Sequence, residues 1–229
     1  MKKRNEFLYL IWKDPITRNN FTVGKINRNE KYTFEYCEDF GKAEAYGWLK
    51  LEAFPEEKIY ESDVLFPVFA SRLPDKKRRD IDKILEKYEL AEYDEFELLR
   101  KSEGRLPIDT YSFIDPIFSE METIQRDFYI MGIRYHTPCK GENCELLPKV
   151  TVGDELYFEK EPNNQHDSDA LRILTQNGDF LGYVPRYYNV SIIERMNKGV
   201  SYTCKVIDVN LNQDCSECIK VRLNMPRRK

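Results

Sequence analysis

A ten-residue polar segment, Glu161–Ala170, carries the side chains best suited to binding. Six of its ten residues are Asn, Asp, Gln or His, all able to form hydrogen bonds. The runs on either side, 155–160 and 171–175, are rich in β-branched and aromatic residues, which is typical of strands. Because ordered loops between strands often hold binding groups, this loop predicts a binding site. A solvated loop held by Asx turns is the alternative interpretation.

Two more motifs flank this loop in the sequence. Gly132-Ile-Arg-Tyr-His136 ends an apolar run upstream, and Gly182-Tyr-Val-Pro-Arg186 follows an Asn-Gly turn downstream. A single-stranded nucleotide offers a flat base, an anionic phosphate and, at a 3′ end, a free hydroxyl. A site for it needs an aromatic ring, a cation and an acceptor for that hydroxyl. The three motifs together supply these groups.

The order of the three motifs resembles that of the HIRAN domain, a β-barrel-like module similar to OB and SH3 folds. The resemblance covers residues 127 to about 213. HIRAN domains of helicase-like eukaryotic proteins bind the 3′ ends of single-stranded DNA, so the resemblance implies a DNA-binding role. The nucleic-acid-binding residues that it implies are Arg134, Tyr135, His136, Asn164, His166, Asp167, Tyr183 and Arg186.

The resemblance also implies a role for each motif. Arg134 and Tyr135 match the Arg-Tyr pair of the family's first strand, which contacts phosphate and stacks on a base. In the polar loop, Asp167 matches the residue that accepts the terminal hydroxyl. Arg186, at the end of the downstream motif, matches a cation that faces phosphate. Tyr183 is expected to lie half in the core and half in the site.

The two histidines depart from the family pattern. His136 and His166 stand where the DNA-end binders carry tyrosines. Histidine can stack on a base and, when protonated, donates to phosphate, so one interpretation keeps the binding role with a dependence on pH. A purely structural role for either histidine is the alternative.

The first half of the chain predicts a small α+β domain. Strands are expected at 6–12, 21–26 and 31–36, and Trp12 and Trp48 are expected in the core. Helices are then expected from Val64 to Leu73, from Asp75 to Tyr88 with Ile81, Ile84, Leu85 and Tyr88 as a buried stripe, and after a cap at Asp94.

This half resembles the N-terminal subdomain of HipA-type toxin kinases. The similarity covers residues 6 to about 105 and rests on four segments: 21–26, 32–36, 49–54 and 65–74. The ATP-binding loop and the catalytic and metal-binding aspartates of those kinases have no match here. The resemblance therefore implies a non-enzymatic docking module, with a HipA-like kinase or another protein as its partner.

The chain is thus predicted to contain two domains, residues 1–105 and 127–229, joined by a linker at 106–126. The overall fold class is α+β, with a β-barrel-like second domain that carries one helix. The net charge is −4, and residues 127–229 carry equal numbers of acidic and basic side chains. Overall charge therefore does not itself indicate nucleic-acid binding, which depends on clustered cations.

Six cysteines raise the question of a metal site. Four of them could supply a tetrahedral zinc ion, although unpaired thiols are the favoured interpretation, because only the second pair has the usual Cys-x2-Cys spacing. These four are Cys139, Cys144, Cys215 and Cys218. Cys37 and Cys204 lie in strand-like runs and are expected in the core.

The sequence has no apolar run long enough to cross a bilayer and no signal-peptide pattern, which predicts a cytoplasmic protein. The resemblance to HipA-type kinases implies a bacterial or phage origin. Nothing in it matches a phosphate-binding loop or a nucleophile motif, so we expect a binding protein rather than an enzyme. The competing hypothesis is a protein-interaction component of a toxin–antitoxin or phage-defence system that does not bind DNA ends.

Overall fold

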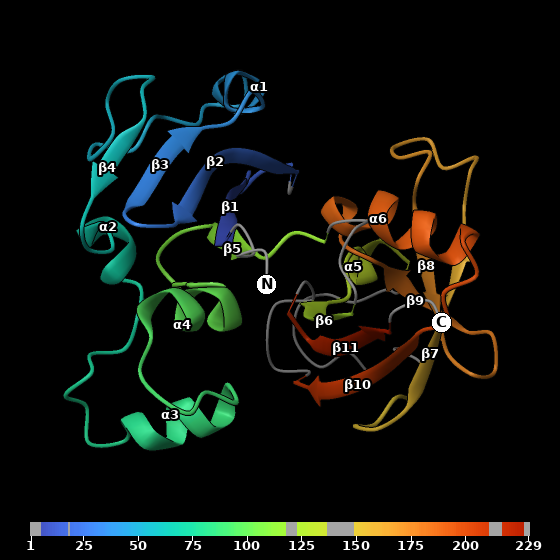
Figure 1. Ribbon diagram of the computed structural model, residues 1–229. Helices are drawn as coiled ribbons and strands as arrows, with labels where there is room; N and C mark the ends of the chain where they lie inside the picture. Colours follow the sequence, from blue (N-terminus) through green and yellow to red (C-terminus); the bar gives the residue numbers. More distant parts are fainter. Residues whose placement is uncertain (1–5, 18, 118–122, 137–148, 211–216, 227–229) are drawn as a thin grey trace. The chain divides into compact units, whose positions relative to one another are not determined.

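The computed structural model describes residues 6–17, 19–117, 123–136, 149–210 and 217–226. The chain divides into two compact units, Met1–Asp115 and Pro116–Lys229 (Figure 1). Each unit contains its own antiparallel sheet together with helices. The predicted α+β class is therefore confirmed.

Five strands form the sheet of the first unit, in the order β4-β3-β2-β1-β5. The three predicted strands are confirmed, with ends that differ by one to two residues. The strand bounds are β1 (Glu6–Lys13), β2 (Asn20–Arg28), β3 (Tyr32–Tyr36), β4 (Tyr60–Ser62) and β5 (Tyr111–Ile114).

The core of the first unit is mainly aromatic. Phe34 in β3 is fully buried, and its ring centroid lies 4.3 Å from that of Phe54 and 5.3 Å from that of Phe69. Trp12 and Trp48 are also buried, as predicted. Because aromatic side chains bury large apolar areas, this cluster holds the helices against the sheet.

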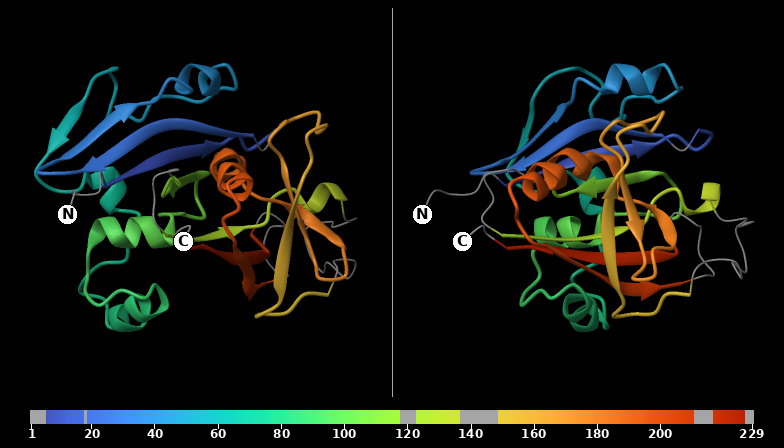
Figure 2. Two further views of the ribbon diagram at one scale, coloured as in Figure 1. Left: turned by 45° about the vertical axis from the view of Figure 1, so that its right-hand side comes forward. Right: turned by 90° about the vertical axis from the view of Figure 1, so that its right-hand side faces the viewer.

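Among the described residues of the first unit are four helices, and α4 lies against one face of the sheet (Figure 2). Asp94 caps α4 as predicted, because its carboxylate accepts hydrogen bonds from the backbone N–H groups of Phe96 and Glu97. The helix bounds are α1 (Phe40–Glu44), α2 (Pro67–Ala70), α3 (Ile81–Lys87) and α4 (Glu95–Ser102).

Two helices are shorter than predicted. The first is α2, which forms a single turn, and the second is α3, which begins at Ile81 rather than after Asp75. The Asp75 carboxylate instead accepts from the backbone N–H of Lys77 and shapes a turn. Four successive cations precede Asp80, and they would oppose the helix dipole if they formed the first turn. The predicted apolar stripe of α3 is only half-buried.

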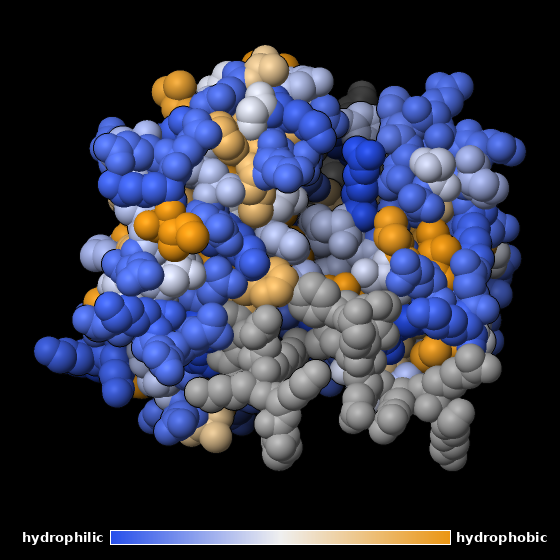
Figure 3. Space-filling model, turned by 45° about the horizontal axis from the view of Figure 1, so that its top comes forward, coloured by the Kyte–Doolittle hydropathy of each residue, from blue (hydrophilic) through white to orange (hydrophobic). Residues whose placement is uncertain are grey.

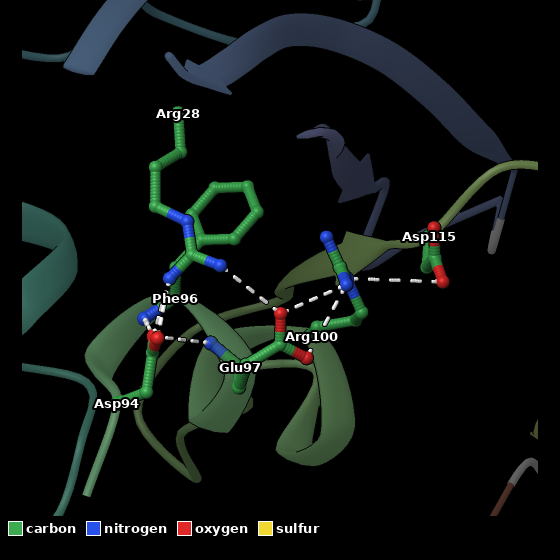
Figure 4. Close-up of polar contacts among 6 residues, drawn as sticks. All are labelled: Arg28, Asp94, Phe96, Glu97, Arg100 and Asp115. Atoms are coloured by element: carbon green, nitrogen blue, oxygen red, sulfur yellow. Dashed lines mark hydrogen bonds and ion pairs between the residues drawn. The ribbon is translucent and has the colours of Figure 1, made fainter. Parts of the chain in front are cut away.

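A network of charged side chains joins α4 to β2 (Figure 4). The Arg28 Nη1 atom lies 2.6 Å from both Asp94 oxygens, and its Nη2 lies 3.2 Å from Glu97. Glu97 also accepts from Arg100, and both guanidinium groups lie over the Phe96 ring. Burial alone would raise the pKa of Asp94, but hydrogen bonds from Arg28 and the helix N–H groups lower it. The capping carboxylate therefore stays ionised.

The segment predicted as a linker, 106–126, contains part of the first unit. Residues 111–114 form β5, which pairs with β1, and the adjacent Asp109 binds Arg72. The reason is apolar burial, since Phe113 is fully buried beside Phe69. Residues 118–122 lie outside the described part of the chain.

In the part of the second unit that the structure describes, six strands form a sheet in the order β6-β11-β10-β7-β8-β9. The strands curve into a half-barrel (Figure 2), and α6 packs on them through Tyr188, whose ring lies 5.8 Å from that of Phe128. The bounds are β6 (Ile124–Tyr129), α5 (Ile133–His136), β7 (Glu155–Lys160), β8 (Leu171–Leu174), β9 (Phe180–Tyr183), α6 (Arg186–Asn197), β10 (Thr203–Val209) and β11 (Ile219–Met225).

The two ends of this curved sheet meet at one backbone bridge. Met131, just after β6, and Tyr183 in β9 exchange hydrogen bonds of 2.9 and 2.8 Å between their backbone N–H and C=O groups. Gly182 makes this approach possible, because a Cβ atom there would lie 2.5 Å from the Met131 carbonyl oxygen. The bridge therefore gives the sheet its barrel-like closure.

The face drawn in Figure 3 is largely hydrophilic, and its hydrophobic side chains occur in small separate groups. Within the described ranges, no helix has the length and apolar character needed to cross a membrane.

Candidate functional site

The polar loop between β7 and β8 is shaped by its own side chains. The Asn164 Oδ1 atom accepts from the backbone N–H groups of His166 and Asp167, at 2.9 and 3.2 Å. Asp167 Oδ1 in turn accepts from the N–H of Asp169 at 3.0 Å. These hydrogen bonds are the Asx turns of the alternative interpretation, and they hold the Asn164 and Asp167 side chains in defined positions. The turns therefore provide rigidity that a binding site needs.

The opposite end of Asn164 fastens the loop to β9. Its Nδ2 donates to Glu161 Oε2 at 2.7 Å and lies 3.3 Å from the Tyr183 hydroxyl. Tyr183 also donates to Glu161, at 2.9 Å. Burial, together with this hydrogen bond and the charge of Glu161, raises the pKa of Tyr183 above its ordinary value. The phenol therefore remains protonated.

Asp167 is the acidic group of the loop that α6 holds in place. Its Oδ2 accepts from Asn189 Nδ2 at 3.0 Å and lies 3.7 Å from Arg186 Nε. The Asp167 side chain is 17% exposed, whereas that of Arg186 is 76% exposed. Since each carboxylate oxygen has two lone pairs, Asp167 can accept a further hydrogen bond from a ligand. Asp167 thus offers a fixed acceptor beside an exposed cation.

The segment with Arg134 and Tyr135 lies on the one-turn helix α5, so its predicted place on a strand is wrong. Gly132 has a φ of +76°, which turns the chain out of the strand direction, and the Tyr135 N–H then bonds to the Gly132 carbonyl. Tyr135 is 63% exposed, and the Arg134 guanidinium lies 4.8 Å from its ring centroid. The turn leaves both side chains accessible.

Several of the eight predicted site residues are linked directly. Asn164 contacts Tyr183, Asp167 lies beside Arg186, and Arg134 contacts Tyr135. The helix with Arg134 and Tyr135 follows the bridge to Tyr183, and a Cβ at Gly132 would lie 3.3 Å from the Tyr183 ring. The loop therefore meets both flanking motifs at Tyr183. The other two predicted site residues are the histidines. His166 is exposed in the loop, and the side chain of His136 lies outside the described part of the structure.

Sequence analysis missed Asn189, which holds Asp167 in place. It lies in α6 and is 2% exposed. A signal was present, because an asparagine between Tyr188 and Ile192 interrupts the apolar face of the helix. Buried polar side chains in such positions usually serve a defined hydrogen bond.

We expect Asn189→Ala to destabilise the second unit by about 1.5 kcal/mol, because hydrogen bonds to charged groups contribute about that much or more. The buried Asn189 Oδ1 has no hydrogen-bond partner among the described residues. Because the variant also removes this unsatisfied atom, the loss of stability should not exceed the contribution of the bond to Asp167. Urea titration followed by circular dichroism measures the change. Ser191→Ala is the matched control, since Ser191 in the same helix donates to a neutral carbonyl, that of Ile117. Equal losses in the two variants would contradict the charge-assisted bond.

The cysteines leave the zinc hypothesis untested. Cys139, Cys144 and Cys215 lie outside the described residues, and Cys218 is buried just before β11. Within the described ranges, no three His, Cys, Asp or Glu side chains are grouped as metal ligands would be.

The two cysteines expected in the core differ from each other. Cys204 is buried as predicted, and burial raises the pKa of its thiol to about 12. Cys37 is only half-buried, which differs from the prediction. Burial and the nearby Glu35 raise the pKa of the Cys37 thiol to about 11, so both thiols stay protonated near neutral pH.

Comparison with known proteins bears on both units. Residues 125–224 match the family model of the HIRAN domain, and residues 15–107 match that of the HipA N-terminal domain. Both resemblances found in the sequence are therefore confirmed. A search of the curated proteins finds no match.

Two solved structures are similar to part of the chain. A protein from Lactobacillus plantarum is 20% identical, with 46% of this chain and 97% of that chain covered and a TM-score of 0.35. The HIRAN domain of human HLTF is 17% identical, with 45% of this chain and 77% of that chain covered and a TM-score of 0.30.

Proposed function

We propose that this chain, which joins a HipA N-terminal domain to a HIRAN domain, is a non-enzymatic protein that binds single-stranded DNA at 3′ ends. The observation that carries the proposal is the Asp167 carboxylate, which Asn189 holds at 3.0 Å beside the exposed Arg186. A fixed acceptor next to a cation suits a terminal hydroxyl and the phosphate of the same nucleotide.

The ring of Tyr135 supplies the third requirement of such a site. It is 63% exposed, so a base can stack on it without displacing core residues. The Arg134 guanidinium beside that ring supplies a second cation for the phosphate backbone. We propose that His136 and His166 also belong to this site and that they stack on a base or donate to phosphate.

Charge explains why a free hydroxyl is preferred. A 3′-phosphate would place negative charge against the Asp167 carboxylate, and like charges a few ångströms apart repel each other strongly in a partly buried site. A hydroxyl would instead donate a hydrogen bond to the carboxylate. The proposed site therefore distinguishes the two ends through one side chain.

We expect Asp167→Asn to reduce the affinity for a 3′-hydroxyl strand by about tenfold, because a hydrogen bond to a charged acceptor is lost. The same variant is expected to bind a 3′-phosphorylated strand more tightly than wild type does, because the repulsion is removed. Fluorescence anisotropy with short labelled strands at low and moderate salt measures both affinities.

Asp169→Asn is the matched control for this test. Asp169 lies in the same loop, is exposed and carries the same charge. Its variant should keep the wild-type preference for the hydroxyl end. No binding of any strand by wild type at low salt would contradict the proposed function, and so would an unchanged preference in Asp167→Asn.

A second function is favoured by the match of residues 15–107 to the HipA N-terminal domain. We propose that the first unit binds a protein partner of the HipA-like kinase class, within a bacterial toxin–antitoxin or phage-defence system. Co-purification with a kinase-like protein encoded beside this one tests the proposal. The interaction should persist in Arg134→Ala and Asp167→Asn, since both residues lie in the other unit.

A further inference from the structure

An arginine and an aromatic ring that the proposed site does not use lie beside it on β8 and β9. Arg172 in β8 pairs in register with Tyr183 in β9. The Arg172 guanidinium lies 4.5 Å from the ring centroid of Phe180, and the Phe180 and Tyr183 rings are 5.2 Å apart in an edge-to-face arrangement. These three side chains form a continuous cation–aromatic group.

The group lies on the outer face of the half-barrel. Leu171, Ile173 and Leu181 alternate with it along the strands and are fully buried, so they supply the core. Phe180 is half-buried, and the Arg172 side chain is 32% exposed. Packing of the core therefore does not explain why an arginine and a phenylalanine stand together here.

The outer group is continuous with the candidate site through Tyr183. The Tyr183 hydroxyl contacts Glu161 and Asn164 of the polar loop, and its backbone pairs with Met131 next to α5. From Tyr183 the row continues across the sheet to Arg172 and then to Glu159, whose Oε2 lies 2.7 Å from Arg172 Nη1. A strand whose end lies at Asp167 can therefore extend along this row.

We propose that Phe180 and Arg172 form a second nucleotide subsite, which binds the unpaired nucleotides that precede the 3′ end. A base stacks on Phe180, and its phosphate accepts hydrogen bonds from Arg172. This inference rests on the proposed function of the end site. It assigns that site a track for a strand of several nucleotides rather than a pocket for one.

Two features of the row favour the binding of a phosphate by Arg172 in place of Glu159. Arg172 already lies over one face of the Phe180 ring, so its guanidinium is beside the phosphate of a base that stacks on the other face. Its present partner, Glu159, is 51% exposed, and such surface ion pairs are weak and easily replaced. A phosphate can therefore take the place of the carboxylate at Arg172.

The experiment compares labelled 3′-hydroxyl strands of two and six nucleotides by fluorescence anisotropy with the full chain. Phe180→Leu keeps an apolar side chain for the fold but removes the ring, and Arg172→Gln removes the cation. Each is expected to weaken binding of the six-nucleotide strand by about tenfold while the two-nucleotide strand is bound as by wild type. Thermal melting verifies that each variant is folded.

Lys205→Gln is the matched control for the loss of charge. Lys205 forms a comparable exposed cross-strand ion pair with Glu155, on β10 and β7, and its variant should bind both strands as wild type does. Glu159→Gln removes the competing carboxylate and should tighten binding of the longer strand.

Failure of the subsite differs from failure of the end site in this design. If wild type prefers the hydroxyl end but both subsite variants bind the two strands as wild type does, the track is wrong and the end site stands. Equal losses for both strand lengths also overturn a separate subsite. If wild type binds neither strand, the proposed function fails and the track fails with it.

Discussion

Replacing Gly182 by alanine is expected to destabilise the second unit by about 3 kcal/mol, the combined effect of a steric clash and a strained backbone. An added Cβ would lie 2.5 Å from the Met131 carbonyl oxygen and 2.8 Å from Ile130 Cγ2. Because a backbone oxygen cannot move aside as a flexible side chain can, the bridge between Met131 and Tyr183 would have to open. Since Tyr183 also joins the loop to β9, DNA binding should be lost together with stability.

The two tryptophans allow this loss to be assigned to one unit. Trp12 and Trp48 both lie in the first unit, so their fluorescence follows that unit during urea denaturation, whereas circular dichroism follows both. Gly182→Ala should shift only the dichroism transition. Gly178→Ala is the control, because its φ is +85° but no atom lies within 4 Å of the added Cβ. It should lose about 1 kcal/mol, and an equal loss in both variants would contradict the clash.

Arg72→Met is expected to destabilise the first unit by about 3–5 kcal/mol, the loss typical when one partner of a buried ion pair is removed. The Arg72 side chain is only 8% exposed. Its Nη1 and Nη2 atoms each donate to Asp109 at 2.7 Å, and its Nε donates to the Gly104 carbonyl at 2.6 Å. The variant leaves the Asp109 carboxylate, 26% exposed, without its cation next to β5. The tryptophan fluorescence transition should therefore move to lower urea concentration.

The stability difference between wild type and Arg72→Met is expected to depend on pH. Burial alone would raise the pKa of Asp109, but the hydrogen bonds from Arg72 and the Tyr111 N–H lower it below its ordinary value of 3.8. The stabilisation from the ionised carboxylate is therefore present above that ordinary value and is lost as the pH falls through the lowered pKa. The difference between wild type and Arg72→Met should be largest near pH 7 and should shrink towards pH 3.

Arg78→Met is the control for the removal of a charge. Arg78 pairs with Asp80, and both side chains are about half exposed. Exposed pairs contribute little to stability because water and salt screen them, so this variant should unfold almost as wild type does. A comparable loss in Arg72→Met and Arg78→Met would mean that burial does not set the strength of the Arg72–Asp109 pair.

Much of the secondary structure could be predicted from local patterns. The strands at 6–12 and 155–160 alternate or concentrate apolar residues as β-structure requires, and both form where expected. The cap at Asp94 also forms, because an N-cap depends on side-chain and backbone groups only two or three residues apart. Interactions between residues so close in the chain can be predicted from the sequence without knowledge of the tertiary structure.

Elements whose ends depend on distant contacts were predicted less well. Residues 111–114 were placed in a linker, yet they form β5 because the β1 edge and the aromatic core accept them. The segment that forms α5 was predicted as strand, because the sequence does not show that the Tyr183 ring lies against Gly132. Both differences arise from partners far away in the chain.

The candidate site divides in the same way. The sequence by itself determined the resemblance of the second unit to the HIRAN domain, because three motifs occur in that family's order, and the family model confirms the match. The binding residues that the motifs imply stay a prediction. Only the tertiary structure decided how they meet, through the Met131–Tyr183 bridge, the bond from Asn189 to Asp167 and the placement of Arg172 over Phe180. The physical reason is that composition and spacing specify the local chemistry of each segment, whereas distances between segments depend on the packing of the whole barrel.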